Sequence, residues 1–131
     1  MGRGSYQKGA RFEYELKNLF LEKGFCVLRT GKSGVDGESP DLVCLHTTKK
    51  FALECKSIQQ SSLFIDAAKM RIMQDWEKRA GLPFYVAWKY ARGEYRFIPL
   101  MLFHENKSSY SVPRETARLG LSLDDLLKTK N

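Results

Sequence analysis

The chain begins with a hydrophobic pattern that is typical of an amphipathic helix. Over Lys8–Lys23, apolar side chains recur at intervals of three or four residues, which places them on one helix face. Gly24 follows, at a position where glycine commonly ends a helix. Residues 1–7 are small and polar, and they predict a loose arm before the helix. The apolar face consists of Phe12, Leu16, Leu19 and Phe20.

Three short apolar runs then predict β-strands. The first run is Phe25–Arg29, and a loop rich in glycine and serine follows over Thr30–Ser39. Two further runs, Asp41–Leu45 and Phe51–Lys56, lie on either side of a polar turn at residues 47–50 and predict a hairpin. In such a hairpin the start of the first strand lies close to the end of the second.

The second half of the chain predicts two more helices and two more strands. A second helix is expected over Ile65–Ala80, with strands over Phe84–Tyr90 and Tyr95–Leu100. Residues 103–120 have only a weak pattern, and Ser122 is placed to begin a short helix that ends at Leu127. The apolar face of the second helix consists of Ile65, Ala68, Ile72, Met73, Trp76 and Ala80.

This order of elements predicts an α/β fold with a mixed central β-sheet that is flanked by helices. A chain of 131 residues is long enough to bury one core. We therefore expect a single domain over residues 1–131, with a core at about 8–100 and a C-terminal tail at about 101–131.

The predicted hairpin brings together residue types that suit metal-dependent chemistry. Side chains alternate across a strand, so Glu54 and Lys56 share one face, with Asp41 beside them. Two carboxylates and an ammonium suit a hard cation such as Mg²⁺ together with a water or a phosphate. The alternative is an amphipathic strand that faces water, and the spacing alone favours it. Glu13 and Glu15 flank the first helix's apolar face, and periodicity does not choose between them.

Composition and charge narrow the class of protein. The hydrophobic content of 43% excludes a disordered chain, and no apolar run is long enough to span a membrane. With no apolar signal region, we expect an intracellular, cytoplasmic protein. The net charge of +7 favours a polyanion partner, with nucleic acid as the first candidate. Cys26, Cys44 and Cys55 lie in apolar runs, so we expect buried, reduced thiols.

Several motifs then occur together in the order found in a known nuclease family. A helix glutamate, Pro40-Asp41 and Glu54-x-Lys56 resemble the PD-(D/E)xK nuclease core of many restriction and recombination enzymes. The wider set resembles the archaeal Holliday-junction resolvases over about Lys8–Leu100, which implies a restriction-endonuclease-like fold. The motifs are Lys8-Gly9, Glu13-x-Glu15-Leu16, Gly24-Phe25-x-Val27-x-Arg29, Ser33-Gly34, Pro40-Asp41-Leu42-Val43, Glu54-Cys55-Lys56-Ser57 and Tyr95-Arg96-Phe97-Ile98.

The resemblance implies phosphodiester hydrolysis that depends on Mg²⁺, with Mn²⁺ as an alternative ion. The implied metal ligands are Glu13, Asp41, Glu54 and the backbone carbonyl of Cys55. By the same resemblance, Lys56 orients or deprotonates the attacking water, and Ser33 matches a catalytic serine of the loop, with Ser39 left open as the alternative. The implied catalytic residues are Glu13, Ser33, Asp41, Glu54 and Lys56.

Basic residues are candidates for holding the DNA by its phosphates. The candidates are Lys8, Arg11, Arg29 and Lys32, and we favour Arg29 and Lys32 because they flank the predicted loop. For any one of them, a solvated surface charge is the alternative. The chain departs from the family at Tyr14, where members often carry arginine directly after the helix glutamate.

The resemblance implies a homodimer that resolves four-way junctions in chromosomal DNA by paired, symmetric nicks. Candidate dimer contacts are Met70, Met73 and the leucines of the tail (Leu119, Leu121 and Leu123), with core packing as the alternative for each. A second reading is a PD-(D/E)xK nuclease with another DNA substrate, either restriction-like or in repair. A third is a catalytically inactive, DNA-binding relative.

Overall fold

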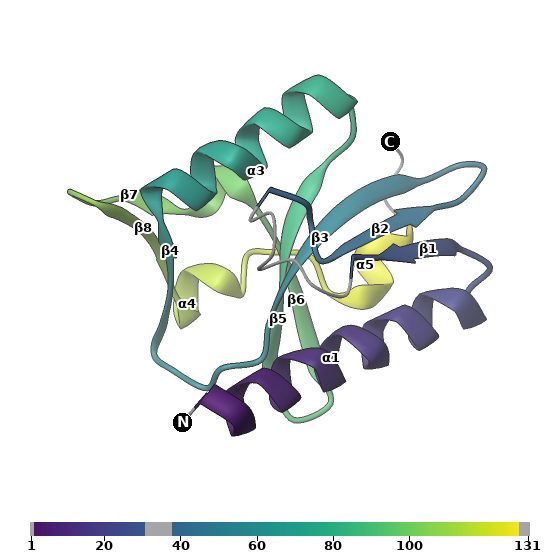
Figure 1. The fold of residues 1–131 in the computed structure, drawn as a ribbon, viewed down its shortest axis with the longest axis horizontal. Helices are drawn as coiled ribbons and strands as arrows, with labels where there is room; N and C mark the ends of the chain where they lie inside the picture. Colours follow the sequence, from purple (N-terminus) through teal and green to yellow (C-terminus); the bar gives the residue numbers. More distant parts are fainter. Residues whose placement is uncertain (1, 31–37, 129–131) are drawn as a thin grey trace.

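Figure 1 shows the protein in a computed structural model that describes residues 2–30 and 38–128, with side chains from Gly9 onward. The predicted residues Lys32 and Ser33, and the side chain of Lys8, lie outside this description. The elements are α1 (Gly2–Glu22), β1 (Cys26–Arg29), β2 (Leu42–Leu45), β3 (Lys50–Lys56), β4 (Ser62–Asp66), α3 (Ala67–Ala80), β5 (Phe84–Ala91), β6 (Glu94–Pro99), a 3₁₀ turn (Leu100–Leu102), β7 (His104–Glu105), β8 (Ser109–Pro113), α4 (Arg114–Ala117) and α5 (Leu123–Lys128).

The main sheet has five strands in the order β1-β2-β3-β5-β6. Strands β3 and β5 are parallel and the other neighbours are antiparallel, so the sheet is mixed, as predicted. Each face has its own hydrophobic cluster: Phe12, Leu16 and Phe20 of α1 cover one face, and Met70 and Met73 of α3 belong to the cluster on the other. The predicted α/β architecture with helices on both faces is confirmed (Figure 1).

The hairpin of β2 and β3 forms in the predicted register. Leu42 pairs with Leu53, so the antiparallel ladder places Asp41, one residue before β2, level with Glu54. Leu53 belongs to the cluster beneath α1, whereas Ala52 belongs to the cluster beneath α3. The alternation along β3 therefore separates the two sides of the sheet as the sequence predicted.

A second sheet of three strands, in the order β4-β8-β7, was not predicted. Its strand β4 contains Ile65, which the sequence placed in the second helix; that prediction is wrong, and α3 begins at Ala67. Alternating burial shows why: Leu63 and Ile65 face the core, while Phe64 between them is 61% exposed. The predicted apolar face of the helix is also partly wrong, because Ala68 and Ala80 are exposed.

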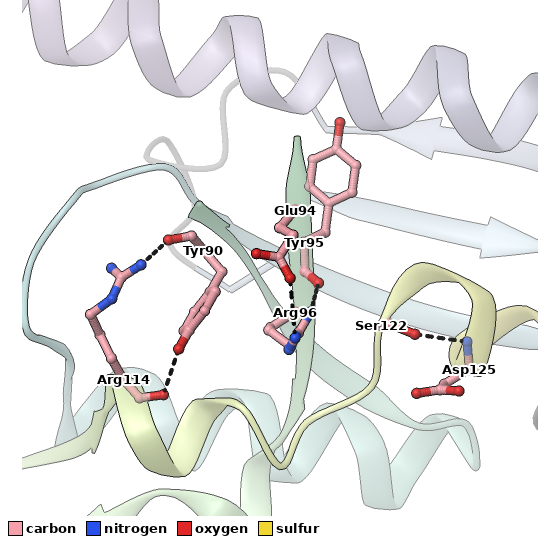
Figure 2. A network of polar contacts seen from close by, with 7 residues as sticks. All are labelled: Tyr90, Glu94, Tyr95, Arg96, Arg114, Ser122 and Asp125. Carbon is pink, nitrogen blue, oxygen red and sulfur yellow. Dashed lines mark hydrogen bonds and ion pairs between the residues drawn. The ribbon is translucent and has the colours of Figure 1, made fainter. Parts of the chain in front are cut away.

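Three local predictions have different outcomes. The loose arm over residues 1–7 is wrong, because α1 begins at Gly2; extending a helix adds one hydrogen bond per residue without a new nucleation cost. Two predicted helix caps are confirmed. Gly81 ends α3 at a φ of 70°, and at the start of α5 the Ser122 hydroxyl accepts the Asp125 N–H at 3.1 Å (Figure 2). The predicted burial of Cys26 is wrong, because its strand lies at the edge of the sheet and the thiol is exposed.

Candidate active site

Two carboxylates lie buried where β2 begins and β3 ends. Asp41 is 4% exposed and Glu54 is 8% exposed. One oxygen of Asp41, Oδ2, accepts the backbone N–H of Cys55 at 2.8 Å, which ties the start of β2 to the end of β3. The hairpin thus fixes both carboxylates through its own backbone, so the site depends on the register and not on a flexible loop.

Glu54 carries a charge that its surroundings only partly compensate. Burial, followed by repulsion from Asp41, raises the pKa of Glu54 to about 7, although Lys69 and Lys56 act against this shift. The Lys69 ammonium on α3 lies 3.5 Å from Oε1 of Glu54. Among the described residues, however, no group makes a well-directed hydrogen bond to that buried oxygen. The carboxylate is therefore held close to positive charge with one coordination position open.

Lys69 was missed by the sequence analysis. It lies in the first turn of α3, outside every motif, and only the packing of this helix on the sheet brings it to Glu54. Its one sequence signal is a lysine close to the start of a helix, where cations are disfavoured by the helix dipole. Such a lysine suggests a partner elsewhere in the fold.

Glu13 approaches the site from α1. Burial, followed by repulsion from Asp41, raises the pKa of Glu13 to about 6, while Arg29 opposes the shift. The Arg29 Nε lies 3.1 Å from Oε1 of Glu13, and the guanidinium stacks over the Tyr14 ring at 4.1 Å. Tyr14, the departure noted in the sequence, thus packs against the guanidinium of Arg29 on β1.

Glu15 lies in different surroundings. Its carboxylate is 3.1 Å from the Lys89 ammonium and accepts a hydrogen bond from the Tyr95 hydroxyl. Burial alone would raise the pKa of Glu15, but Tyr95 and Lys89 outweigh it and lower the pKa below its usual value. Of the two helix glutamates, only Glu13 interacts with Asp41.

Comparison with known proteins identifies the family. A model of the archaeal Holliday junction resolvase (Hjc) family matches residues 4–131 of the chain. The chain belongs to this family. Its resolvase relatives include the crossover junction endodeoxyribonuclease Hjc of Archaeoglobus fulgidus, 27% identical over 91% of this chain and 88% of the relative. The same enzyme of Methanocaldococcus jannaschii is 27% identical over 95% of this chain and 90% of the relative.

The solved structure of Archaeoglobus fulgidus Hjc, a Holliday junction resolvase, has the same fold. It superposes with a TM-score of 0.80 at 24% sequence identity, over 91% of this chain and 94% of that one. The restriction-endonuclease-like fold that the motifs implied is confirmed, and so is the family resemblance. Membership of a resolvase family also implies dependence on a divalent metal ion.

The β2–β3 hairpin of the present chain has residues that suit a divalent metal ion. Its two carboxylates are hard oxygen donors, and the crowding that raises the pKa of Glu54 is relieved by a cation. Within residues 2–30 and 38–128, no three Asp, Glu, His or Cys side chains gather closely enough to hold one ion. Magnesium is commonly bound by one or two carboxylates, with waters and substrate phosphates completing its shell. Asp41 and Glu54 match that pattern. Glu13, the third carboxylate ligand implied by the sequence, forms an ion pair with Arg29 at 3.1 Å.

Three further predicted residues lie in the described part of the chain. Lys56 ends β3, two residues beyond Glu54 on the same face, and it is half-buried. Arg11 is exposed on α1, and Ser39, the alternative loop serine, is half-buried. Within the described part of the chain, no helix is long and apolar enough to cross a membrane.

Proposed function

We propose that this chain is a structure-selective endonuclease that resolves four-way DNA junctions by hydrolysing phosphodiester bonds. The observation that carries the proposal is the buried pair Asp41 and Glu54, with Lys56 on the same strand face and an open oxygen on Glu54. Family membership supports the substrate, since the named relatives are crossover junction endodeoxyribonucleases. We assign the activity to a single domain that spans the chain and acts on chromosomal DNA in the cytoplasm.

Asp41 and Glu54, with the backbone carbonyl of Cys55, are the proposed ligands of Mg²⁺, for which Mn²⁺ is the expected substitute. When bound, the ion neutralises the phosphate and lowers the pKa of a coordinated water. Lys56 holds positive charge beside Glu54 and is placed to orient the water or to stabilise the phosphate. Glu13 stays a proposed catalytic carboxylate and a further candidate metal ligand, and its Oε1 lies 3.1 Å from the Arg29 Nε.

DNA is held by basic residues around the hairpin. Arg29 and Lys32 are the favoured phosphate contacts, with Lys8 and Arg11 as further candidates. Ser33 is the proposed catalytic serine, and Ser39 is the alternative. Such contacts hold the duplex without reading its sequence, as a structure-selective enzyme requires.

The proposed working unit is a homodimer. Each chain has one set of Asp41, Glu54 and Lys56, whereas resolving a junction requires two matched incisions, so two chains related by a twofold axis meet the need. Met70 and Met73 are 0% and 1% exposed within one chain, which removes them as dimer contacts. Leu119 is 74% exposed and stays a candidate.

The test compares labelled four-way junction with linear duplex of the same arm sequence, with and without Mg²⁺. We expect paired nicks in opposed strands of the junction only, and only with the metal. Equal cleavage of duplex would favour a restriction-like or repair nuclease of the same fold. Junction binding without any cleavage would favour an inactive DNA-binding relative.

A further inference from the structure

A hollow of about 280 Å³ lies directly beside Lys56. Its lining combines the end of β3, the segment that follows it, strand β4 and Gly9 of α1. Two apolar side chains of this lining face solvent: Ile58 is 48% exposed and Phe64 is 61% exposed. Phe64 thus presents an aromatic ring to solvent in a hollow that the proposed catalytic Lys56 also lines.

The segment that links β3 to β4 is fixed from beneath by hydrogen bonds. The Trp88 indole N–H donates to the carbonyl of Ile58 at 2.8 Å, and the Gln59 amide donates to the carbonyl of Lys89 at 2.7 Å. At the C-terminal end of this segment, the Arg114 guanidinium donates to the carbonyl of Gln60 at 3.2 Å. Ile58 and Phe64 are therefore presented by an ordered backbone and not by a loose loop.

Arg114 is itself held by two aromatic rings. Its guanidinium lies 5.0 Å from the centre of Trp88 and 4.4 Å from that of Tyr90. Figure 2 shows the reciprocal contact: the guanidinium donates to the Tyr90 carbonyl, and the Tyr90 hydroxyl donates to the Arg114 carbonyl. The C-terminal segment thus supports the wall of the hollow, although Arg114 lies far along the chain from Lys56.

The lining indicates the chemistry of its occupant. A flat aromatic group suits a surface formed by Ile58 and Phe64, and an anionic group suits Lys56 at the edge of the hollow. A nucleotide carries both, in the form of a base and the phosphate attached to it. Bases stack on exposed aromatic side chains whatever their identity, which suits an enzyme that reads structure and not sequence.

We propose that the hollow receives an unstacked nucleobase from the branch point of the junction, next to the phosphate that Lys56 faces. Taking a base out of a stack costs least where pairing or stacking is already interrupted, as it is where strands exchange partners. In a continuous duplex the same base stays between its neighbours. The hollow therefore favours junctions over duplex, and it extends the proposed function with a source of selectivity.

The test is a double-mutant cycle between Phe64→Ala and junctions that carry an abasic sugar at one branch-point position, scanned position by position. Affinity is measured without metal, so that no strand is cut. We expect Phe64→Ala to weaken binding of the intact junction by about tenfold, the loss of one base–aromatic stack. The abasic sugar should cancel this loss only at the position whose base enters the hollow, or at its twofold mate. On the matching abasic junction, wild type and variant should bind equally.

Three controls separate this proposal from other readings. Phe64→Trp should retain wild-type affinity, and Met101→Ala, which removes an 88% exposed side chain elsewhere, should have no effect. Duplex affinity should be unchanged in all variants. Circular dichroism and sedimentation complete the set, because an altered oligomeric state in Phe64→Ala would identify the hollow as a subunit contact and overturn the proposal.

The outcomes also distinguish the base site from the function on which it rests. Equal losses on intact and abasic junctions, or no loss at all, would overturn the base site alone, provided that the wild type prefers junctions. If the wild type binds junction and duplex equally, the junction-resolving function itself fails.

Discussion

Glu13 and Glu15 leave the same helix two residues apart and enter opposite electrostatic surroundings. On one flank, burial and the charge of Asp41 raise the pKa of Glu13 to about 6. On the other, Tyr95 and Lys89 lower the pKa of Glu15. The carboxylate of Glu13 therefore lies in buried surroundings beside a second carboxylate, whereas the interactions of Glu15 favour its charged form.

The difference shows how a functional cluster departs from a structural one. A structural ion pair satisfies its charge within the chain, as Glu15 does with the Lys89 ammonium at 3.1 Å. The cluster of Glu13, Asp41 and Glu54 crowds like charges and leaves an oxygen of Glu54 without a hydrogen bond from the described residues. Such crowding of buried carboxylates costs stability, and strongly shifted pKa values of this kind cluster at functional sites.

The largest expected effect is the loss of cleavage when either proposed metal ligand, Asp41 or Glu54, is replaced. Asp41→Asn or Glu54→Gln should reduce junction cleavage by at least about a hundredfold, because each removes a charged metal ligand. Binding of uncut junction should persist or tighten, since repulsion of the phosphates decreases. Single-turnover cleavage with Mg²⁺, and affinity without it, measure the two effects. Near-wild-type cleavage by either variant would place the site elsewhere.

The next prediction compares the two helix glutamates directly. Glu13→Gln should slow cleavage by about tenfold or more, whereas Glu15→Gln should leave the rate within about threefold. Glu15→Gln should instead lower the free energy of unfolding by about 1 kcal/mol, because it weakens its bonds to Tyr95 and Lys89. Cleavage rates and denaturant titrations on the same pair of variants provide the comparison, and a larger rate loss at Glu15 would contradict the assignment.

A third prediction concerns pH. It uses the fact that the pKa values of Glu13 and Glu54 are raised, whereas that of Glu15 is lowered. The folded state keeps a proton on Glu13 up to about pH 6 and on Glu54 up to about pH 7, above the unfolded value of 4.5. Ionisation of these two side chains therefore lowers the free energy of unfolding of the metal-free protein as pH rises from 4.5 to about 7, with no further contribution above that range. Glu15 has a lowered pKa, so its contribution is present above the unfolded value and is lost as pH falls.

Thermal unfolding without metal across this pH range is the measurement. Glu13→Gln and Glu54→Gln should each show a smaller fall in Tm with rising pH than the wild type, and Glu15→Gln should not. Added Mg²⁺ should raise the Tm of the wild type more at the alkaline end of the range. If Glu54→Gln has the same pH slope as the wild type, burial and repulsion from Asp41 do not raise the pKa of Glu54 as we state.

The smallest effect concerns phosphate contacts. Replacing Arg29 or Lys32 by alanine should reduce the slope of log K against log salt by about one unit each, the value for one lost phosphate contact. Lys78, exposed on α3, serves as the control lysine and should leave the slope unchanged. An unchanged slope for Arg29→Ala would confine its role to Glu13 and Tyr14.

Local patterns in the sequence were sufficient to predict the hairpin and its carboxylates. The turn and the alternation of β3 specify the register, and this register places Asp41 beside Glu54. The second sheet could not be predicted in this way. Strand β8 contains Ser109 and Ser111 and pairs with β4, which lies more than forty residues earlier, so its stability comes from a distant partner and not from its own pattern.

The site was likewise predictable only in part. Periodicity placed Glu13 and Glu15 equally close to the sheet, and only the positions of Asp41, Lys89 and Tyr95 in space separate them. Lys69 belongs to no motif and reaches Glu54 through the packing of α3. Residues that act through their own strand are visible in the sequence, whereas those that arrive from another layer become visible only in the fold.

The exposed thiol on the edge strand offers a practical route to these measurements. Cys26 is exposed, whereas burial raises the pKa of Cys44 to about 12 and that of Cys55 well above its usual value. Because alkylating reagents react with the thiolate, a maleimide dye should label Cys26 alone in the native protein. The unmodified sequence therefore allows a single fluorophore to be attached on β1, three residues from Arg29, to report the approach of labelled junction arms by energy transfer.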